Sequence, residues 1–262
     1  MELEGIRTWV DRFGDPGRPP LLLLHGGLSA NEDWGPLPEL LSADFLVVAP
    51  ERRGHGRTPD SEAPFTYEAM VAETVAAART LVRPPTHVVG WSDGGIVGLM
   101  LALARPELVA RLVLIGANFD VAGLTGPFAT ETDPDAPLWA PMRACYERLS
   151  PDGPGHWPVV LAKTLALWRT APHLDPLSIA RVRTRTLVLV GDDDAVTLEH
   201  TGALFSALPD ADLAVVPHAS HAVVLERPAL VTALVREFLA GDPPATLFPV
   251  RRRRDPAAPG PR

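Results

Sequence analysis

The sequence predicts an α/β fold in which a mostly parallel sheet carries helices on both faces. Two observations lead to this prediction. Six short apolar runs of strand length recur along the chain, and helix-like stretches lie between most of them. One long stretch, residues 118–184, interrupts this alternation. Strands that alternate with helices favour a parallel sheet covered on both sides.

The expected strands are continuous apolar runs, as is typical of strands buried on both faces. An additional early strand near Ile6–Arg12 is expected to join an edge of the sheet as a hairpin partner. The six main strands, in chain order, are Leu21–Leu24, Phe45–Ala49, His87–Val89, Leu112–Ile115, Thr186–Val190 and Leu213–Val216.

Helix-like stretches follow several of these strands. The expected helices are Tyr67–Val82, Gly95–Ala104, Val196–Leu208 and Pro228–Leu239. Together, the strands and helices give a predicted core of residues 1–117 and 185–240. A single core domain with an insertion suits a chain of 262 residues, of which 46% are hydrophobic.

The predicted insertion, residues 118–184, is far longer than one crossover helix requires. It contains Trp139, Trp157 and Trp168, half of the six tryptophans, together with many prolines. This composition favours helices and turns that bury aromatic side chains over a flexible linker. We therefore expect a helical lid over a cleft.

The charge distribution excludes some partners. The formal net charge is -8, but residues 241–262 hold five arginines and two aspartates, so the rest of the chain carries about -11. A body this acidic argues against nucleic-acid binding. The run Arg251–Arg254 lies among Pro, Gly and Ala, and the 241–262 tail is expected to be disordered.

Neither a secretory signal nor a membrane span is expected. Residues Met1–Val10 contain acids and no apolar run, and no segment approaches the ~20 apolar residues that a span needs. A cytoplasmic protein is the resulting expectation. Cys145 is the single cysteine, and no Cys/His cluster has metal-site spacing, so neither a metal nor a cofactor is expected. Cys145 has no strand-turn context, which favours a small helix residue over a nucleophile.

A glycine-flanked serine follows the third expected strand, in the segment Gly90-Trp91-Ser92-Asp93-Gly94-Gly95. Gly-x-Ser-x-Gly between a strand and a helix holds the serine in a strained turn, where side chains at positions 90 and 94 would collide with backbone. The Ser92 Oγ would then lie at the carboxyl edge of the sheet. The nearby helix N-terminus favours an alkoxide and an oxyanion there.

Two other interpretations of this turn are less favoured. A dinucleotide-binding loop needs Gly-x-Gly-x-x-Gly after the first strand, and neither condition is met. Asp93 could be the nucleophile instead, but the residue two positions before it is Trp91, which the turn would not accommodate. Ser92 is therefore the predicted nucleophile.

With these residues in view, the chain resembles the α/β-hydrolase superfamily over Leu21–Leu239. Two segments, Gly90–Gly95 and Ile115–Asn118, look most like its valacyclovir hydrolase (biphenyl hydrolase-like) branch. The resemblance implies an α/β-hydrolase fold with a helical lid insertion. Arg53-Gly54-His55-Gly56-Arg57-Thr58 resembles a family turn, although Glu51 stands where the family usually has Asp. We expect that departure to alter loop hydrogen bonding and not the chemistry.

The family order of catalytic residues is Ser, then Asp, then His. The resemblance implies that Asp194 is the acid, because it lies three residues after Gly191 at the end of a strand. Asp192 and Asp193 are expected to structure the loop by Asx-turn bonding. Asp120, after the preceding strand, is an alternative acid.

The resemblance also selects His221 as the general base, since an apolar run and Glu-Arg-Pro follow it. His218 is the alternative base. The segment His25-Gly26-Gly27 resembles the oxyanion loop, in which His25 is structural. The backbone N–H groups of Gly27 and Asp93 are the expected oxyanion donors, with Leu28 as the alternative to Gly27.

The predicted reaction is ester hydrolysis through an acyl-enzyme on Ser92, with a small-molecule ester or related acyl compound as substrate. The Asp93 carboxylate is a candidate for binding a substrate ammonium, which in the resembled branch suits α-amino-acid esters. The alternative is that it bonds to a lid arginine or a backbone donor. Other enzymes with the same triad are alternative functions: a cofactor-free haloperoxidase or perhydrolase, a lactonase and a carbon-carbon bond hydrolase. A non-catalytic ligand-binding relative is the remaining alternative.

Overall fold

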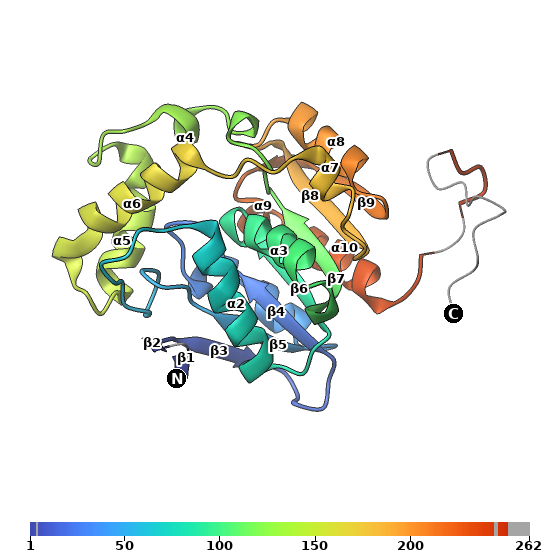
Figure 1. Cartoon of the computed structure of the whole chain (residues 1–262), viewed down its shortest axis with the longest axis horizontal. Helices are drawn as coiled ribbons and strands as arrows, with labels where there is room; N and C mark the ends of the chain where they lie inside the picture. Colours follow the sequence, from blue (N-terminus) through green and yellow to red (C-terminus); the bar gives the residue numbers. More distant parts are fainter. Residues whose placement is uncertain (4, 244–245, 251–262) are drawn as a thin grey trace.

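A central, mostly parallel sheet organises the chain, as Figure 1 shows. The computed structural model describes residues 1–3, 5–243 and 246–250. Within them, seven strands pair in the order β3-β5-β4-β6-β7-β8-β9, with β3 antiparallel to β5 and the others parallel. The strands are β1 Glu2–Leu3, β2 Ile6–Arg7, β3 Val10–Phe13, β4 Pro20–Leu24, β5 Leu46–Pro50, β6 Thr86–Trp91, β7 Val109–Ile115, β8 Thr186–Asp193 and β9 Ala211–Ser220.

Helices cover both faces of this sheet, which confirms the predicted α/β fold. The α-helices are α1 Leu37–Leu41, α2 Tyr67–Leu81, α3 Asp93–Ala104, α4 Pro127–Thr130, α5 Ala140–Leu149, α6 Trp157–Thr170, α7 Pro176–Ile179, α8 Leu198–Ala207, α9 Val223–Glu226 and α10 Pro228–Ala240. Short 3-10 helices are η1 Asn31–Trp34, η2 Pro106–Leu108, η3 Val121–Gly123, η4 Pro137–Trp139 and η5 Pro154–His156. The six main predicted strands overlap β4 to β9, and the four predicted helices overlap α2, α3, α8 and α10.

The early segment differs from the expectation of one strand over Ile6–Arg12. Strand β2 pairs with β1 in a separate two-stranded sheet, and β3 pairs antiparallel with β5 at the edge of the main sheet. Between them, the Trp9 amide donates to the Thr58 hydroxyl at 2.9 Å. That side-chain bond replaces a ladder bond, so the strand is interrupted at this point.

Alternation along β4 shows how one strand serves two cores. Leu22 and Leu24 join the core formed with α2, α3 and α8, whereas Leu21 and Leu23 join the core formed with α1 and α10. Successive side chains of a strand point to opposite faces, and all four are at most 1% exposed. The sheet is therefore buried on both faces around β4, as the continuous apolar run predicts.

The segment between β7 and β8 forms helices α4 to α7 and extends beyond one end of the sheet (Figure 1). Trp139 and Trp157 are almost fully buried in it. Asp60 of the core ties this segment down, because its carboxylate contacts Lys163 of α6 at 2.6 Å and His156 at 3.0 Å. Lys163 is the one lysine in the chain.

The division into core, lid and tail stays a prediction. Much of the predicted disordered tail, 244–245 and 251–262, lies outside the described residues. In the described part of the chain, no helix combines the length and the apolar composition that crossing a membrane requires.

Candidate active site

Ser92 sits in a sharp turn between β6 and α3. Its φ of 54° and ψ of -122° lie outside the regions that a serine ordinarily adopts, at a cost on the order of 1–3 kcal/mol. The surrounding backbone imposes this conformation: the Ser92 amide donates to Ile115 O at 2.8 Å, and the amides of Gly95 and Ile96 donate to Ser92 O. A strained residue held in this way points to a functional role.

Two glycines make this turn possible. A Cβ on Gly90 would overlap the backbone of Gly94, and a Cβ on Gly94 would overlap the carbonyl of Leu24. The obstacles are backbone atoms of β4 and α3, which cannot move aside without disturbing the sheet. The predicted need for glycine on both sides of Ser92 therefore has a direct steric cause.

The structure brings Ser92, His221 and Asp194 together. Ser92 Oγ lies 2.9 Å from His221 Nε2, and His221 Nδ1 lies 2.7 Å from Asp194 Oδ1. An ionised carboxylate only accepts hydrogen bonds, so Nδ1 carries the proton and Nε2 is free to accept from the serine hydroxyl. This is the tautomer that a general base beside Ser92 needs.

Asp194 is fixed by its own loop. Its fully buried side chain accepts hydrogen bonds from the amides of Val196, at 3.0 Å, and Gly191, at 3.4 Å. Gly116 lies against both partners: a Cβ there would stand 3.0 Å from His221 Nδ1 and 3.2 Å from Asp194 Oδ2. The φ of Gly116 is +54°, so the position favours glycine on two counts.

The alternative acid is engaged elsewhere. Asp120 Oδ2 lies 2.7 Å from His173 Nδ1, and its Oδ1 accepts from the Ala122 amide. Asp192 lies in β8 and accepts from the Ala219 amide of β9 at 3.1 Å, a bond between neighbouring strands and not the Asx turn expected of it.

Neither His218 nor Cys145 takes part in the contacts among Ser92, His221 and Asp194. His218 is exposed. Cys145 lies in α5, where burial raises the pKa of its thiol to about 11, far from the thiolate that a nucleophile requires.

The predicted oxyanion groups lie around Ser92. Gly26 approaches so closely that a Cβ on it would be 3.3 Å from Ser92 Cβ, and Gly27 and Asp93 both line the same cavity as Ser92. Asp93 is the first residue of α3, and the first amides of a helix have no partner inside it. Leu28, the alternative donor, has a φ of +52°, so this loop is strained as well.

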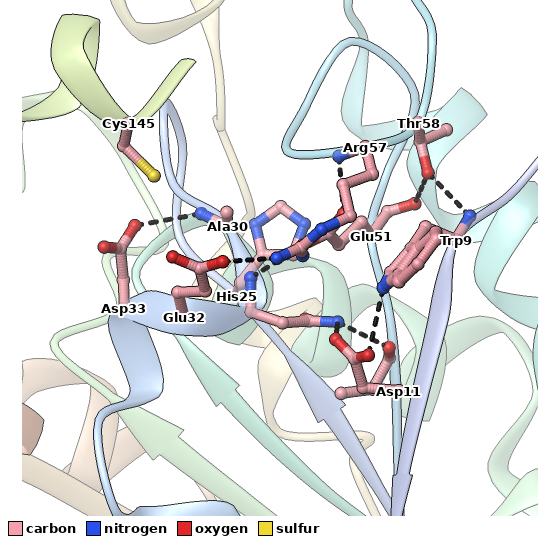
Figure 2. A network of polar contacts seen from close by, with 12 residues as sticks. Trp9, Asp11, His25, Ala30, Glu32, Asp33, Glu51, Arg57, Thr58 and Cys145 are labelled. Atoms are coloured by element: carbon pink, nitrogen blue, oxygen red, sulfur yellow. Dashed lines mark hydrogen bonds and ion pairs between the residues drawn. The ribbon is translucent and has the colours of Figure 1, made fainter. Parts of the chain in front are cut away.

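Glu51 anchors the loop that follows the oxyanion segment, as Figure 2 shows. The buried Glu51 carboxylate accepts a hydrogen bond from the Asn31 backbone amide at 3.1 Å. It also accepts hydrogen bonds from the backbone amide and the guanidinium of Arg57. Burial is the largest influence on this carboxyl and raises its pKa. Arg57 also contacts Glu32, which pairs with Arg148 of α5. The Glu51 carboxylate therefore takes part in the hydrogen bonding of this loop, and the effect of Glu in place of Asp stays a prediction.

The Asp93 carboxylate points into a buried polar cluster. Its Oδ1 accepts from the Tyr67 hydroxyl at 2.8 Å and from Trp168 Nε1 at 2.9 Å, and Trp168 Nε1 lies 3.1 Å from Oδ2. Burial raises the pKa of Asp93, and the charge of Arg52 acts in the opposite direction. Among the described residues, these side-chain donors to the Asp93 carboxylate are neither an arginine of the 118–184 segment nor a backbone group. The partners therefore differ from those that were expected if Asp93 did not bind a substrate amine.

Trp91 is a site residue whose role was not predicted from sequence patterns. Its indole Nε1 donates to the carbonyl of His221 at 2.9 Å, and the two rings lie 6.2 Å apart. The residue directly before the serine therefore holds the histidine loop. Its position within Gly-x-Ser-x-Gly is the one signal that could have suggested such a role.

A cavity of about 300 Å³ opens beside Ser92 and His221. Its walls come from the core loops and from the 118–184 segment, and most of the latter are apolar. The contributions of that segment are Asn118, Leu124, Phe128, Pro141, Met142 and Trp168. Among the described residues, no group of three or more His, Cys, Asp or Glu side chains is placed to hold a metal ion.

A parallel sheet that presents a strained serine to a histidine–aspartate pair is the arrangement of a class of serine hydrolases. The chain belongs to the alpha/beta hydrolase family, whose model matches residues 21–234. Serine hydrolase BPHL from Mus musculus is 28% identical over 270 residues, covering 91% of this chain and 85% of that protein. This relative confirms the predicted resemblance to the biphenyl hydrolase-like branch.

Two further comparisons show how varied the relatives are. Lipase LipV from Mycobacterium tuberculosis is 39% identical over 110 residues, which cover 42% of this chain and 41% of that protein. The crystal structure of the enol-lactonase from Burkholderia xenovorans LB400 matches with a TM-score of 0.76 at 21% identity, covering 91% of this chain and 98% of the other. That likeness shows the α/β-hydrolase fold alone. Family and relatives together make the chain an enzyme that hydrolyses esters or related bonds.

Proposed function

We propose that the protein is a serine hydrolase that cleaves carboxylic esters through an acyl-enzyme on Ser92. The observation that carries this proposal is the unbroken chain of contacts from Ser92 Oγ to His221 at 2.9 Å and from His221 to Asp194 at 2.7 Å. A serine hydroxyl is a weak nucleophile until a neighbouring base removes its proton. The geometry supplies that base, with a buried carboxylate behind it.

The proposed cycle has two halves. His221 Nε2 takes the Ser92 proton as Oγ forms a bond to the ester carbonyl carbon. The carbon–oxygen bond to the alcohol then breaks, and His221 gives its proton to that oxygen. Water, deprotonated by His221, attacks the acyl-enzyme; the bond to Ser92 then breaks, His221 returns the proton to Ser92 Oγ, and the acid is released. Asp194 orients the imidazole and stabilises its cation in each half.

The negative charge on the carbonyl oxygen needs donors in both tetrahedral intermediates. The backbone N–H groups of Gly27 and Asp93 are the proposed pair, and the N-terminal end of α3 adds its favourable dipole. The loss of one such donor typically costs about 2.7–4 kcal/mol of barrier height.

The size and the lining of the cavity favour a substrate whose acyl or alcohol group is small and largely uncharged. Ligand sites generally span about 300–1,000 Å³, so a cavity of about 300 Å³ is at the small end of that range. The lid side of the cavity presents Leu124, Phe128 and Met142. These side chains favour apolar groups over charged ones.

A specific observation favours a narrower substrate class, the α-amino-acid esters. Asp93 is a buried carboxylate that lines the cavity directly beside Ser92. A carboxylate has about four acceptor sites, so the bonds from Tyr67 and Trp168 leave capacity for one ammonium group. A buried negative charge near the reacting carbonyl would discriminate strongly for an amine there.

The comparison of an α-amino ester with its des-amino analogue tests this class. If Asp93 binds the amine, we expect a phenylalanine ester to be cleaved at least about tenfold faster than the 3-phenylpropanoate ester, as kcat/KM. Asp93→Asn should remove most of this preference. Equal rates in the wild type would exclude Asp93 as an amine site and leave the esterase proposal intact.

The esterase proposal itself is tested with a fluorophosphonate probe and an ester panel. We expect stoichiometric labelling of the wild type, mass-spectrometric location of the adduct on Ser92, no labelling of Ser92→Ala, and hydrolysis of short p-nitrophenyl esters. Parallel assays with a lactone, a vinylogous diketone, and peroxide plus acetate measure the competing reactions of the same triad. A faster competing reaction would replace ester hydrolysis as the function. An intact protein inert toward the probe would exclude acyl-enzyme chemistry.

A further inference from the structure

Arg52 is a buried arginine whose side-chain hydrogen bonds all go to the oxyanion loop. The residue is 5% exposed and lies two residues after the end of β5. Among the residues that the structure describes, no carboxylate lies within the 4.0 Å that defines an ion pair with its guanidinium. Burying a charge without a paired carboxylate is costly, so its position calls for another explanation.

The guanidinium holds two successive carbonyl groups of the loop. Nη1 donates to His25 O, and Nη2 donates to Gly26 O at 2.8 Å. The Arg52 amide also donates to His25 Nε2 at 3.0 Å, and His25 Nδ1 lies 2.8 Å from Gly26 O. Since Nε2 accepts, Nδ1 carries the proton and donates to the same carbonyl. The Gly26 carbonyl therefore has two donors on one side of the loop.

Peptide geometry turns this contact into an orientation of Gly27. In a planar trans peptide, the C=O of one residue and the N–H of the next point in opposite directions. The bond from Arg52 to Gly26 O therefore directs the Gly27 N–H away from Arg52. Gly27 lines the cavity, and Gly26 stands against Ser92 Cβ, so the direction away from Arg52 is toward the reacting centre.

The charge of Arg52 is matched on the other side of the same loop. Asp93 is a buried carboxylate, 3% exposed, whose Oδ2 is so close to Gly27 that a Cβ on Gly27 would overlap it. The attraction between the two charges stabilises both across the loop. Arg52 thus orients the Gly27 peptide, while the residue that supplies the second proposed amide carries the compensating charge.

We propose that Arg52 is a positioning residue: its fork-shaped guanidinium holds the carbonyls of His25 and Gly26 so that the Gly27 N–H points at the oxyanion. This inference rests on the proposed function, since it concerns the oxyanion of ester hydrolysis. Lysine cannot replace arginine here, because a single ammonium has no rigid fork to hold two carbonyls at once.

The experiment compares Arg52→Met and Arg52→Lys with the wild type on a short p-nitrophenyl ester and on its thionoester, in which sulfur replaces the carbonyl oxygen. A thiolate-like sulfur is larger and a weaker acceptor, so it gains less from amide donors than an oxyanion does. We expect the ester kcat of Arg52→Met to fall by about 10²-fold or more, with KM changed far less. The thionoester rate should fall much less, so the ester-to-thionoester ratio should collapse. The ester-to-thionoester ratio of Arg52→Lys should lie between those of the wild type and Arg52→Met.

Arg53→Met is the matched control. Arg53 is also buried, but its guanidinium contacts the Asp60 and Glu73 carboxylates, Ser61 and the carbonyls of Ala63 and Pro64 rather than the oxyanion loop. Its loss should leave the ester-to-thionoester ratio unchanged, whatever its effect on the thermal midpoint.

Three results would overturn the positioning role. The first is an equal fall of both rates in the Arg52 variants, since a merely structural arginine would act in this way. The second is an ester kcat close to the wild-type value. The third is a ratio that collapses equally in Arg53→Met. If Arg52→Met does not fold, the ratio in Arg52→Lys decides. Failure of the proposed function is distinguishable, because the wild type itself would then neither cleave the ester nor react with the fluorophosphonate.

Discussion

Replacement of His221 by alanine is expected to lower kcat for ester hydrolysis by about 10⁶-fold. Loss of the histidine base has an effect of this size in a serine hydrolase whose triad residues act as a unit. The Ser92 hydroxyl keeps its position but loses the acceptor at 2.9 Å that would take its proton. The measurement is single-turnover acylation with a p-nitrophenyl ester, together with the rate of fluorophosphonate labelling. Both rates should fall together, since both reactions require the activated serine.

His218 provides the matched control for this prediction. It lies near the end of β9, three residues before His221, is exposed and has a φ of +53°, a conformation that asparagine tolerates. His218→Asn should therefore retain kcat within about threefold of the wild type. Loss of activity in His218→Asn with retention in His221→Ala would exchange the two histidines in the mechanism.

Replacement of Gly94 by alanine is expected to destabilise the protein by about 3 kcal/mol or more, because the added methyl group overlaps the carbonyl of Leu24 in a packed sheet. For a domain of this size, such a loss lowers the thermal midpoint by roughly 6–12 °C. The variant that still folds should also lose most of its activity, since the turn that carries Ser92 must open. Thermal unfolding monitored by circular dichroism measures the first effect.

Gly202→Ala is the control for Gly94→Ala. Gly202 lies within α8, and an added Cβ there would meet nothing within 4 Å. Alanine in a helix interior is more favourable than glycine by about 0.5–1 kcal/mol, so this variant should be slightly more stable than the wild type. An unchanged midpoint in Gly94→Ala would contradict the steric account of the turn.

Much of the core fold could be predicted because it depends on local patterns. The runs at Leu21–Leu24 and Leu112–Ile115 are apolar at every position, as is typical of a strand covered on both faces. The alternation with helices then determined a parallel sheet. The early segment could not be read in this way, because a side-chain bond between Trp9 and Thr58, far apart in sequence, ends the pairing.

The candidate site could likewise be predicted only where it depends on local sequence patterns. Ser92 and its glycines have a local steric signature, so the sequence was sufficient to propose them. The roles of Trp91, Tyr67, Trp168 and Arg52 depend on contacts across the fold, such as that between Trp91 Nε1 and the His221 carbonyl at 2.9 Å. No spacing rule reports such contacts. They become visible only when the sheet brings separate loops to one edge.

The proposed catalytic residues and one apolar wall of the cavity come from different stretches of the chain. Ser92, Asp194 and His221 all lie on loops of the sheet, whereas Leu124, Phe128 and Met142 come from the segment between β7 and β8. That segment leaves the sheet after one strand and returns before the next, so its exchange need not disturb strand pairing. We therefore expect exchange of this contiguous stretch of the gene to change substrate selectivity, while Ser92, Asp194 and His221 are retained.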